Sequence, residues 1–387
     1  MRARRSPAPG LPSARAADDG IVELLHIAAQ AANIRPPLLL SSLFGLPHTR
    51  LPPYRRFSEY QLLDLWHPLR ALRYLLNVSL PSLPVAPPPF GPPLLGEFFF
   101  QPSVVLQRPD HLGSYTAYPD EAWFFVNGIL TNSAVAQLNA ALLSQLFHRP
   151  ITLLQNATAG LVIDLLQCAV GKQWRRITEP VVKAMPAIHA ALKRPDKRRV
   201  VVIAHSQGTL IMAGVLDLLY QLVGTQPAAG AAAYAEPEFV YPDDAPIVLD
   251  DFERLDEAEL AKLEVYNFAN CASRMPWFSP ADGRRRPLPW LEHFGNQRDL
   301  VARLGMLAPG APANGIRIDG PCWQRDGAWG HLLDEHYLYP IEAAQRRGRK
   351  PGGRGGSAPF RAVGPQSSVL APRLFAYLNG GSPPQSA

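Results

Sequence analysis

A serine lies at a sharp corner between two segments with different hydrophobic patterns. The run before it, Val200 to Ala204, is continuously apolar, which is typical of a parallel strand covered on both faces. The run after it, Thr209 to Tyr220, carries apolar residues at helical spacing. A tight strand-to-helix turn needs small residues two positions before and after its pivot, and Ala204 and Gly208 meet that need. Ser206 is therefore a candidate nucleophile, with the positive end of a helix aimed at the reacting oxygen.

An acid candidate and a base candidate follow the serine along the chain. Asp299 comes just after Trp290 to Phe294, which has the pattern of a strand, as does Leu263 to Asn270. Open α/β sheets gather functional side chains beyond the carboxyl ends of their strands. His331 stands in a loop-like break, Trp329-Gly330-His331, before the segment Leu332 to Tyr339. Both side chains are thus expected near the end of a sheet at which Ser206 turns.

The segment Ala204-His205-Ser206-Gln207-Gly208 resembles the Gly-x-Ser-x-Gly nucleophile elbow of the α/β-hydrolase superfamily, with an alanine at the first glycine position. Residues 293–304 are similar to the lipase-like branch, in which an Asp-Ile/Leu-Val pattern carries the acid and a later loop histidine completes the triad. The resemblance covers roughly residues 120–340. It implies a serine hydrolase acting on carboxylic esters through Ser206, Asp299 and His331, which have the order Ser, Asp, His of that family.

The resemblance also assigns each group a chemical role. His331 would take the proton of Ser206 as the serine attacks an ester carbonyl, and Asp299 would hold the imidazole in the useful tautomer. Backbone N–H groups would bind the oxyanion, one of them from Gln207, directly after the nucleophile. The second would come from Ile129 or Leu130, at the end of a strand over Ala122 to Ile129.

Asn127-Gly128, near the end of that strand, takes the place of the His-Gly pair that is frequent in the family. Gly128 would let the chain pass close to the substrate, although Asn-Gly is also simply a good turn. The departures at Ala204 and Asn127 motivate a second hypothesis, an inactive hydrolase-fold binding module. An amidase or acyltransferase with the same triad is a third, because fold and triad are shared across many chemistries.

Other assignments of the same residues stay open. Ser206 could be the N-cap of an ordinary strand–helix junction. His336 is the main rival for the base, whereas His205 is expected to pack or cap on the opposite face of its strand. Asp299 could form a plain ion pair with Arg298. The remaining acids have less suitable contexts, in solvated loops, glycine-containing turns or the helix after Ser206: Asp217, Asp282, Asp319 and Asp326.

The elements around these residues predict an α/β fold, with a mostly parallel sheet covered by helices on both faces. A strand is expected at Ile151 to Gln155. Helices that cross over the sheet are expected in three segments: Ser133 to Phe147, Leu161 to Trp174 and Ile177 to Leu192. The expected catalytic domain spans residues 111–343. Within it, residues 224–246 form an Ala/Pro-rich insertion that is either a lid over an acyl pocket or a surface loop.

The two ends of the chain differ from this domain. Residues 1–19 are expected to be disordered, and 20–110 to form a Pro-rich wrapping segment with short helices, because the whole chain has 41 prolines and they crowd in this part. Those short helices are expected at Ile21 to Ala32 and Tyr60 to Leu76. Residues 344–387 read as a basic, glycine-rich tail, with a short docking helix at Val369 to Leu378.

Composition narrows the range of partners. The net charge is +6, but the basic residues gather in termini and loops, which favours weak contact with anionic membrane surfaces over nucleic-acid binding. Three widely spaced cysteines give neither a disulfide framework nor zinc-ligand spacing, so no metal and no cofactor is expected. No apolar run reaches the ~18 residues of a membrane span, and no signal-peptide core is present. A cytoplasmic hydrolase of small-molecule or lipid esters is the prediction.

Overall fold

The structure is a computed structural model that describes residues 57–60, 69, 104–107, 118–128, 131, 133–156, 179–223, 247–280, 287–309, 315–348, 359–364 and 371–384. Several predictions lie outside this part of the chain. They concern residues 1–19, most of 20–110, the helix at 161–174 and the insertion at 224–246.

The described residues form an α/β fold built on an eight-stranded sheet, in the order β1-β3-β2-β4-β5-β7-β9-β10. The six strands from β3 to β9 run parallel, and an antiparallel strand closes each edge. A separate two-stranded pair joins β6 and β8. The strands are β1 Val104–Gln107, β2 Glu121–Val126, β3 Thr152–Gln155, β4 Arg199–His205, β5 Leu263–Phe268, β6 Arg274–Met275, β7 Trp290–Asn296, β8 Arg317–Ile318, β9 Cys322–Arg325 and β10 Arg361–Val363.

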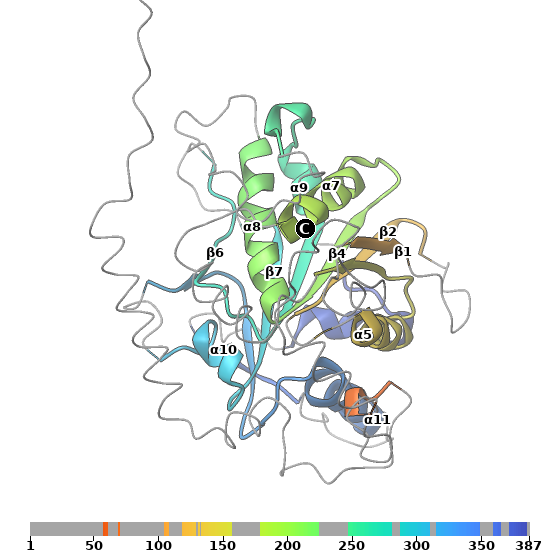
Figure 1. Ribbon diagram of the computed structural model, residues 1–387, viewed down its shortest axis with the longest axis vertical. Helices are drawn as coiled ribbons and strands as arrows, with labels where there is room; N and C mark the ends of the chain where they lie inside the picture. Colours follow the sequence, from red (N-terminus) through yellow and green to blue (C-terminus); the bar gives the residue numbers. More distant parts are fainter. Residues whose placement is uncertain are drawn as a thin grey trace, which may run out of the picture.

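Helices cover both faces of the sheet, as the sequence predicts. Figure 1 shows α7 and α8 beside each other over one face, and α5 and α11 over the other. The helical elements are α5 Ser133–Phe147, α7 Glu179–Lys193, α8 Gln207–Leu222, η2 Leu249–Asp251, α9 Glu257–Ala261, α10 Leu300–Leu304, η3 Asp334–Leu338, α11 Tyr339–Gly348 and η4 Arg373–Gly380. Among these described elements, no helix combines the length and the apolar character needed to cross a bilayer.

The central strand β4 shows why the sheet is buried on both sides. All seven of its residues are buried. Because successive side chains of a strand point to opposite faces, Val200, Val202 and Ala204 pack against α7 and α8, whereas Val201 and Ile203 pack against α5 and the helical segments after His331. The continuous apolar run in the sequence is thus explained by two separate cores that share one strand: the first core lies on the side of α7 and α8, and the second core on the side of α5.

Buried ion pairs hold the C-terminal segment against the end of the sheet opposite the candidate site. Glu121 at the start of β2 binds Arg149 at 2.8 Å, with both side chains fully buried, and Arg149 also donates to the carbonyl of Gly381. Arg373 binds Glu264 of β5 at 2.9 Å. Burying a charge costs desolvation energy, and in these pairs the opposite charge and the hydrogen bonds offset that cost.

The predicted boundary between catalytic domain and tail, at 343/344, falls inside α11, which continues to Gly348. Beyond it, β10 extends the sheet and η4 packs in the second core. The docking helix expected at 369–378 corresponds to η4, a 3-10 segment over Arg373–Gly380. The sequence shows the short apolar pattern of this segment but not the ion pairs that anchor it.

Candidate active site

Ser206 occupies a strained turn between β4 and α8. Its φ of 57° and ψ of −125° lie outside the ordinary regions for a residue with a side chain, and such strain persists where the surroundings enforce it. Its backbone N–H donates to the carbonyl of Phe268 at 2.9 Å, which ties the turn to β5. The chain thus makes the tight strand-to-helix turn that the sequence predicts at Ser206.

Two glycines make room for this turn. A Cβ on Gly208 would lie 2.4 Å from the carbonyl oxygen of Val126, because α8 passes tightly over the end of β2. A Cβ on Gly128 would lie 2.4 Å from the Cβ of Ser206. Neither contact is sterically possible, so both positions require glycine. The alanine at 204, by contrast, is fully buried and fits within the first core.

The structure brings Ser206, Asp299 and His331 together. Asp299 caps α10 after β7, and His331 follows β9, so all three side chains come from the carboxyl ends of strands in one sheet. His331 Nε2 lies 2.8 Å from Ser206 Oγ, and His331 Nδ1 lies 2.8 Å from Asp299 Oδ2. All three residues are buried. An ionised Asp299 accepts the Nδ1 proton, which leaves Nε2 as the acceptor for the serine hydroxyl.

Several donors keep Asp299 ionised. Besides His331, the hydroxyl of Tyr337 donates to Asp299 Oδ2 at 2.6 Å and the N–H of Val301 donates to Oδ1 at 2.9 Å. Burial raises the pKa of Asp299, but the charge of His331 and these hydrogen bonds together bring it below its ordinary value. Arg298, the partner in the ion-pair alternative, instead stacks on Trp329, with its guanidinium carbon 5.0 Å from the ring centroid.

The contact between Asp299 and His331 also shifts the pKa of His331, but upward. Burial lowers the pKa of His331, because it disfavours the imidazolium, but the charge and hydrogen bond of Asp299 outweigh burial. The resulting pKa lies above the ordinary value of 6.5. A more basic imidazole is a better acceptor for the serine proton, provided that it is neutral when the substrate arrives.

The loop that carries His331 is held on both sides of the imidazole. Gly330 has a φ of +94°, and a Cβ there would lie 2.4 Å from the ring of His336. The side-chain amide of Asn296 donates to the carbonyl of Gly330 at 2.9 Å, and His205 Nε2 donates to the carbonyl of His331 at 2.8 Å. His205 therefore binds the backbone of His331. The sequence predicted that His205 would pack or cap, but it did not identify this partner.

His336, the rival base, has a different task. Its Nδ1 accepts the N–H of Leu332 at 2.9 Å, and its Nε2 lies 3.0 Å from the hydroxyl of Tyr60. Because Nδ1 accepts a hydrogen bond, the ring proton is on Nε2, and this N–H donates a hydrogen bond to the hydroxyl oxygen of Tyr60. Burial and the neighbouring charge of Arg325 lower the pKa of His336 to about 3, so it stays neutral. Both ring nitrogens are occupied, and His331 is the histidine in contact with the serine.

Two of the other acidic candidates bind partners outside the group of Ser206, Asp299 and His331. Asp319 accepts the N–H of Trp277 at 3.0 Å, and Asp326 forms a surface ion pair with Arg361. Asp282 lies outside the described residues.

A network of amides connects the turn after β2 with the residue after the nucleophile. Asn127 Oδ1 accepts the N–H of Asn156 at 2.7 Å, and Asn127 Nδ2 donates to the carbonyl of Asn156 at 3.0 Å. Asn156 Nδ2 in turn donates to the side chain of Gln207 at 2.6 Å. Gln207 is the first residue of α8, at the positive end of the helix dipole. The network thus holds the predicted oxyanion donor in place; Ile129, the predicted second donor, lies outside the described residues.

Sequence reasoning missed Tyr337, Asn296 and Asn156. Each is buried, but the sequence around Asn296 and Tyr337 is itself polar, so no local pattern singles these residues out. Their partners are 29 to 51 residues away along the chain, so spacing alone does not identify them.

No protein-family model, no curated protein and no solved structure matches the chain. The assignment of the site therefore depends on the chain's own residues.

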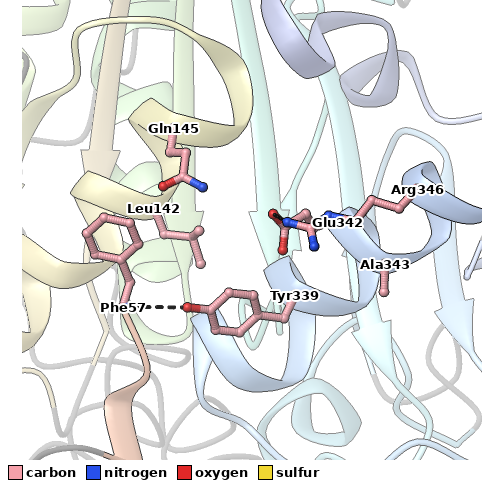
Figure 2. Close-up of a pocket in the computed structure, with 7 residues that line it drawn as sticks. All are labelled: Phe57, Leu142, Gln145, Tyr339, Glu342, Ala343 and Arg346. Atoms are coloured by element: carbon pink, nitrogen blue, oxygen red, sulfur yellow. Dashed lines mark hydrogen bonds and ion pairs between the residues drawn. The ribbon is translucent and has the colours of Figure 1, made fainter. Parts of the chain in front are cut away.

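A hollow of about 390 Å³ lies away from the three side chains, between α5, α11 and Phe57. Figure 2 shows its seven lining residues, with a buried floor that includes Leu142 and Tyr339 and an ion pair of Glu342 and Arg346 at its rim. Ser206, Asp299 and His331 are not among the lining residues, so the hollow is not the site of the candidate chemistry.

Replacing Asp299 with asparagine is expected to lower kcat by about 10⁴-fold. The amide can donate to Nδ1, which favours the tautomer with its proton on Nε2 and removes the acceptor for Ser206. The side chain keeps its shape, so the fold should remain, and circular dichroism with thermal unfolding checks that point. Full turnover by the folded variant would show that Asp299 does not orient the base.

Proposed function

We propose that this chain is a serine hydrolase of the α/β-hydrolase superfamily, in the lipase-like esterase branch, that cleaves carboxylic esters of small molecules or lipids. One observation carries the proposal. A serine in a strained strand-to-helix turn lies 2.8 Å from a histidine that is itself 2.8 Å from a buried carboxylate. This arrangement activates a hydroxyl that is otherwise a poor nucleophile at neutral pH.

Each step of the proposed reaction uses an atom of this site. Ser206 Oγ bonds to the ester carbonyl carbon as its proton moves to His331 Nε2, and the former carbonyl oxygen becomes the oxyanion. Collapse breaks the bond to the alkoxy oxygen, which takes the proton from His331 and leaves as an alcohol. Water then gives a proton to His331, attacks the acyl-serine and releases the acid, while the proton returns to Ser206.

The oxyanion needs fixed donors, and the backbone N–H of Gln207 is the first that we propose. The close approach of Gly128 to Ser206, the clamp of Asn156 on Gln207 and the positive end of α8 all support a site for negative charge beside the nucleophile. We propose Ile129 as the second donor, by its position one residue after Gly128.

The two departures from the family pattern do not favour an inactive binding module. The methyl group of Ala204 is fully buried in the first core, and Asn127 holds the turn after β2 through its bonds to Asn156. Both residues are thus accommodated within an intact Ser-His-Asp arrangement.

Ester hydrolysis can be tested with 4-nitrophenyl esters of acetate, butyrate, octanoate and palmitate, alongside the matched 4-nitroanilides. We expect turnover of at least one ester, and the preferred acyl length defines the substrate class. Cleavage of anilides at comparable rates would instead indicate an amidase. Transfer of the acyl group to added alcohols in preference to water would indicate an acyltransferase, and no turnover by the folded protein would support the binding module.

The pH profile of kcat/KM should have its acidic limb above the ordinary histidine value of 6.5, because the pKa of His331 is raised by Asp299. The base acts only when neutral, so activity is full above its pKa and falls as the pH drops through it. In Asp299→Asn the residual activity should show the limb at lower pH, because the charge that raised the pKa is gone. A limb below 6.5 in the wild type would contradict the assignment of His331 as the base.

A further inference from the structure

Residues 57–60 lie beside the segment that carries His331, although some 275 positions separate them in the sequence. Glu59 is buried, and its carboxylate accepts three successive backbone N–H groups there. Oε1 accepts from Leu333 at 3.1 Å, whereas Oε2 accepts from Asp334 at 3.1 Å and from Glu335 at 3.2 Å. Asn139 of α5 adds a fourth donor at 2.9 Å.

These N–H groups begin a continuous helical run, 333–348, made of η3 and α11. The first N–H groups of a helix have no partner within it, and the positive end of its dipole attracts an anion. Glu59 therefore satisfies this terminus from another part of the chain, and it does so two to four residues after His331.

Two neighbours of Glu59 bind the same run. Tyr60 places its hydroxyl 3.0 Å from His336 Nε2, while His336 Nδ1 accepts the N–H of Leu332, the residue directly after His331. The backbone N–H of Phe57 donates to the hydroxyl of Tyr339 at 3.2 Å, which is the dashed line in Figure 2. The segment thus contacts the first two turns of the helical run, from Leu333 to Tyr339.

The carboxylate of Glu59 is costly to bury, so its position calls for an explanation. Two acids of the run face it, Asp334 and Glu335, and both oxygens of the Asp334 carboxyl group are buried. Burial and the charge of Glu59 raise the pKa of Asp334 well above its ordinary value. Burial raises the pKa of Glu59 to about 7, against the lowering effect of Asn139 and the backbone donors.

We propose that Glu59 and Tyr60 are positioning residues for His331: they fix the first turn of the helical run and, through it, the distance from the imidazole to Ser206. The inference rests on the proposed function. The candidate triad then needs a fourth segment of the chain, from the Pro-rich part, to hold its base. Neither residue contacts the reacting atoms, and both act through the backbone that follows His331.

Glu59→Gln tests this proposal, because glutamine keeps the shape but places an NH₂ group against backbone N–H donors. We expect kcat per titrated active site to fall roughly 10- to 100-fold with KM unchanged, as small displacements of a catalytic group do. The acidic limb of the pH profile should also move to lower pH, because the charge of Glu59 contributes to the raised pKa of His331. Glu342→Gln, later in the same run and paired with Arg346 rather than with the segment 57–60, is the matched control and should leave both quantities unchanged.

Proton NMR gives a second readout that needs no substrate. The proton between His331 Nδ1 and Asp299 should give a downfield resonance in the wild type and in Glu342→Gln, and that resonance should broaden or disappear in Glu59→Gln. Failure of wild-type ester turnover would refute the proposed function while leaving this comparison valid. An unaltered resonance in Glu59→Gln would overturn the positioning role, with or without turnover.

Tyr60→Phe keeps the proposal testable if Glu59→Gln does not fold. Loss of one hydroxyl should lower kcat per titrated site by a few-fold, with KM unchanged. A purely structural role would instead reduce the number of titratable sites and leave kcat per site, the pH limb and the resonance as in the wild type. Wild-type kcat per site, pH limb and resonance in both variants would refute the inference. If Glu59→Gln does not fold, the same outcome in Tyr60→Phe alone would refute it.

Discussion

Ser206→Ala is expected to abolish ester turnover, with a fall in kcat of about 10⁶-fold. The Oγ atom forms the covalent bond to the acyl carbon, so no neighbouring group can replace it at the same position. Alanine keeps the Cβ and tolerates the positive φ of the turn no worse than serine, and the fold should therefore remain. The initial rate on the preferred ester measures the effect, with circular dichroism as the check on folding.

Ser382→Ala provides the matched control, because Ser382 is exposed near the C-terminus and lies on the segment that docks at the opposite end of the sheet. It should turn over at the wild-type rate. Ester hydrolysis by Ser206→Ala at a rate close to the wild type would mean that another group attacks the substrate.

His331→Ala is expected to have nearly the same effect, about 10⁵- to 10⁶-fold on kcat, because members of a triad act as one unit. Without the imidazole, the serine proton has no acceptor at 2.8 Å, and the leaving alcohol has no donor. The double variant Ser206→Ala/His331→Ala should be no slower than either single variant. Activity of the three variants on one ester, at a pH above the acidic limb, gives this comparison.

His336→Ala distinguishes the two histidines. It removes the acceptor of the Leu332 N–H but leaves the contact of His331 with Ser206, so the expected loss is far smaller than that of His331→Ala. His148→Ala, in the turn between α5 and β3, controls for loss of a histidine away from the site and should be neutral. A greater loss in His336→Ala than in His331→Ala would reverse the assignment of the base.

The parts of the site that could be predicted from sequence depend on local geometry. The turn at Ser206 needs a buried strand, a helix and small residues within five positions, and all of these are contiguous. The same holds for Asp299 and His331, since the carboxyl ends of parallel strands meet at one edge of the sheet. Periodicity likewise predicted α5 and β3 within a few residues of their bounds.

The supporting residues could not be predicted, because their contacts join segments that are far apart in sequence. Tyr337 lies in the segment 332–339, to which the sequence assigned no role in the site, yet its hydroxyl donates to Asp299. Glu59 lies in a Pro-rich region with no periodicity that would place it, and it binds a helix terminus some 275 residues later. Burial of a polar group is compensated by whichever donor the tertiary fold brings near, and one sequence does not reveal that partner.

The C-terminal segment illustrates the same limit. Composition predicted a basic, glycine-rich tail, and residues 349–358 of it lie outside the described residues. Arg373, however, pairs with Glu264, and the N–H groups of Arg373 and Leu374 donate to Glu292. From the sequence alone, a basic residue in a tail is expected to be solvated. Arg373 gains a structural role only because the fold brings it to acidic residues of β5 and β7.

Active-site labelling tests the central claim most directly. The folded protein is treated with a fluorophosphonate, which forms a covalent bond with an activated serine, and the modified peptide is located by mass spectrometry. We predict one adduct, on Ser206, that forms in the wild type, is lost in His331→Ala and is absent after denaturation. A folded wild-type protein in which Ser206 stays unmodified, or in which several serines react at equal rates, would contradict the existence of an activated nucleophile at this site.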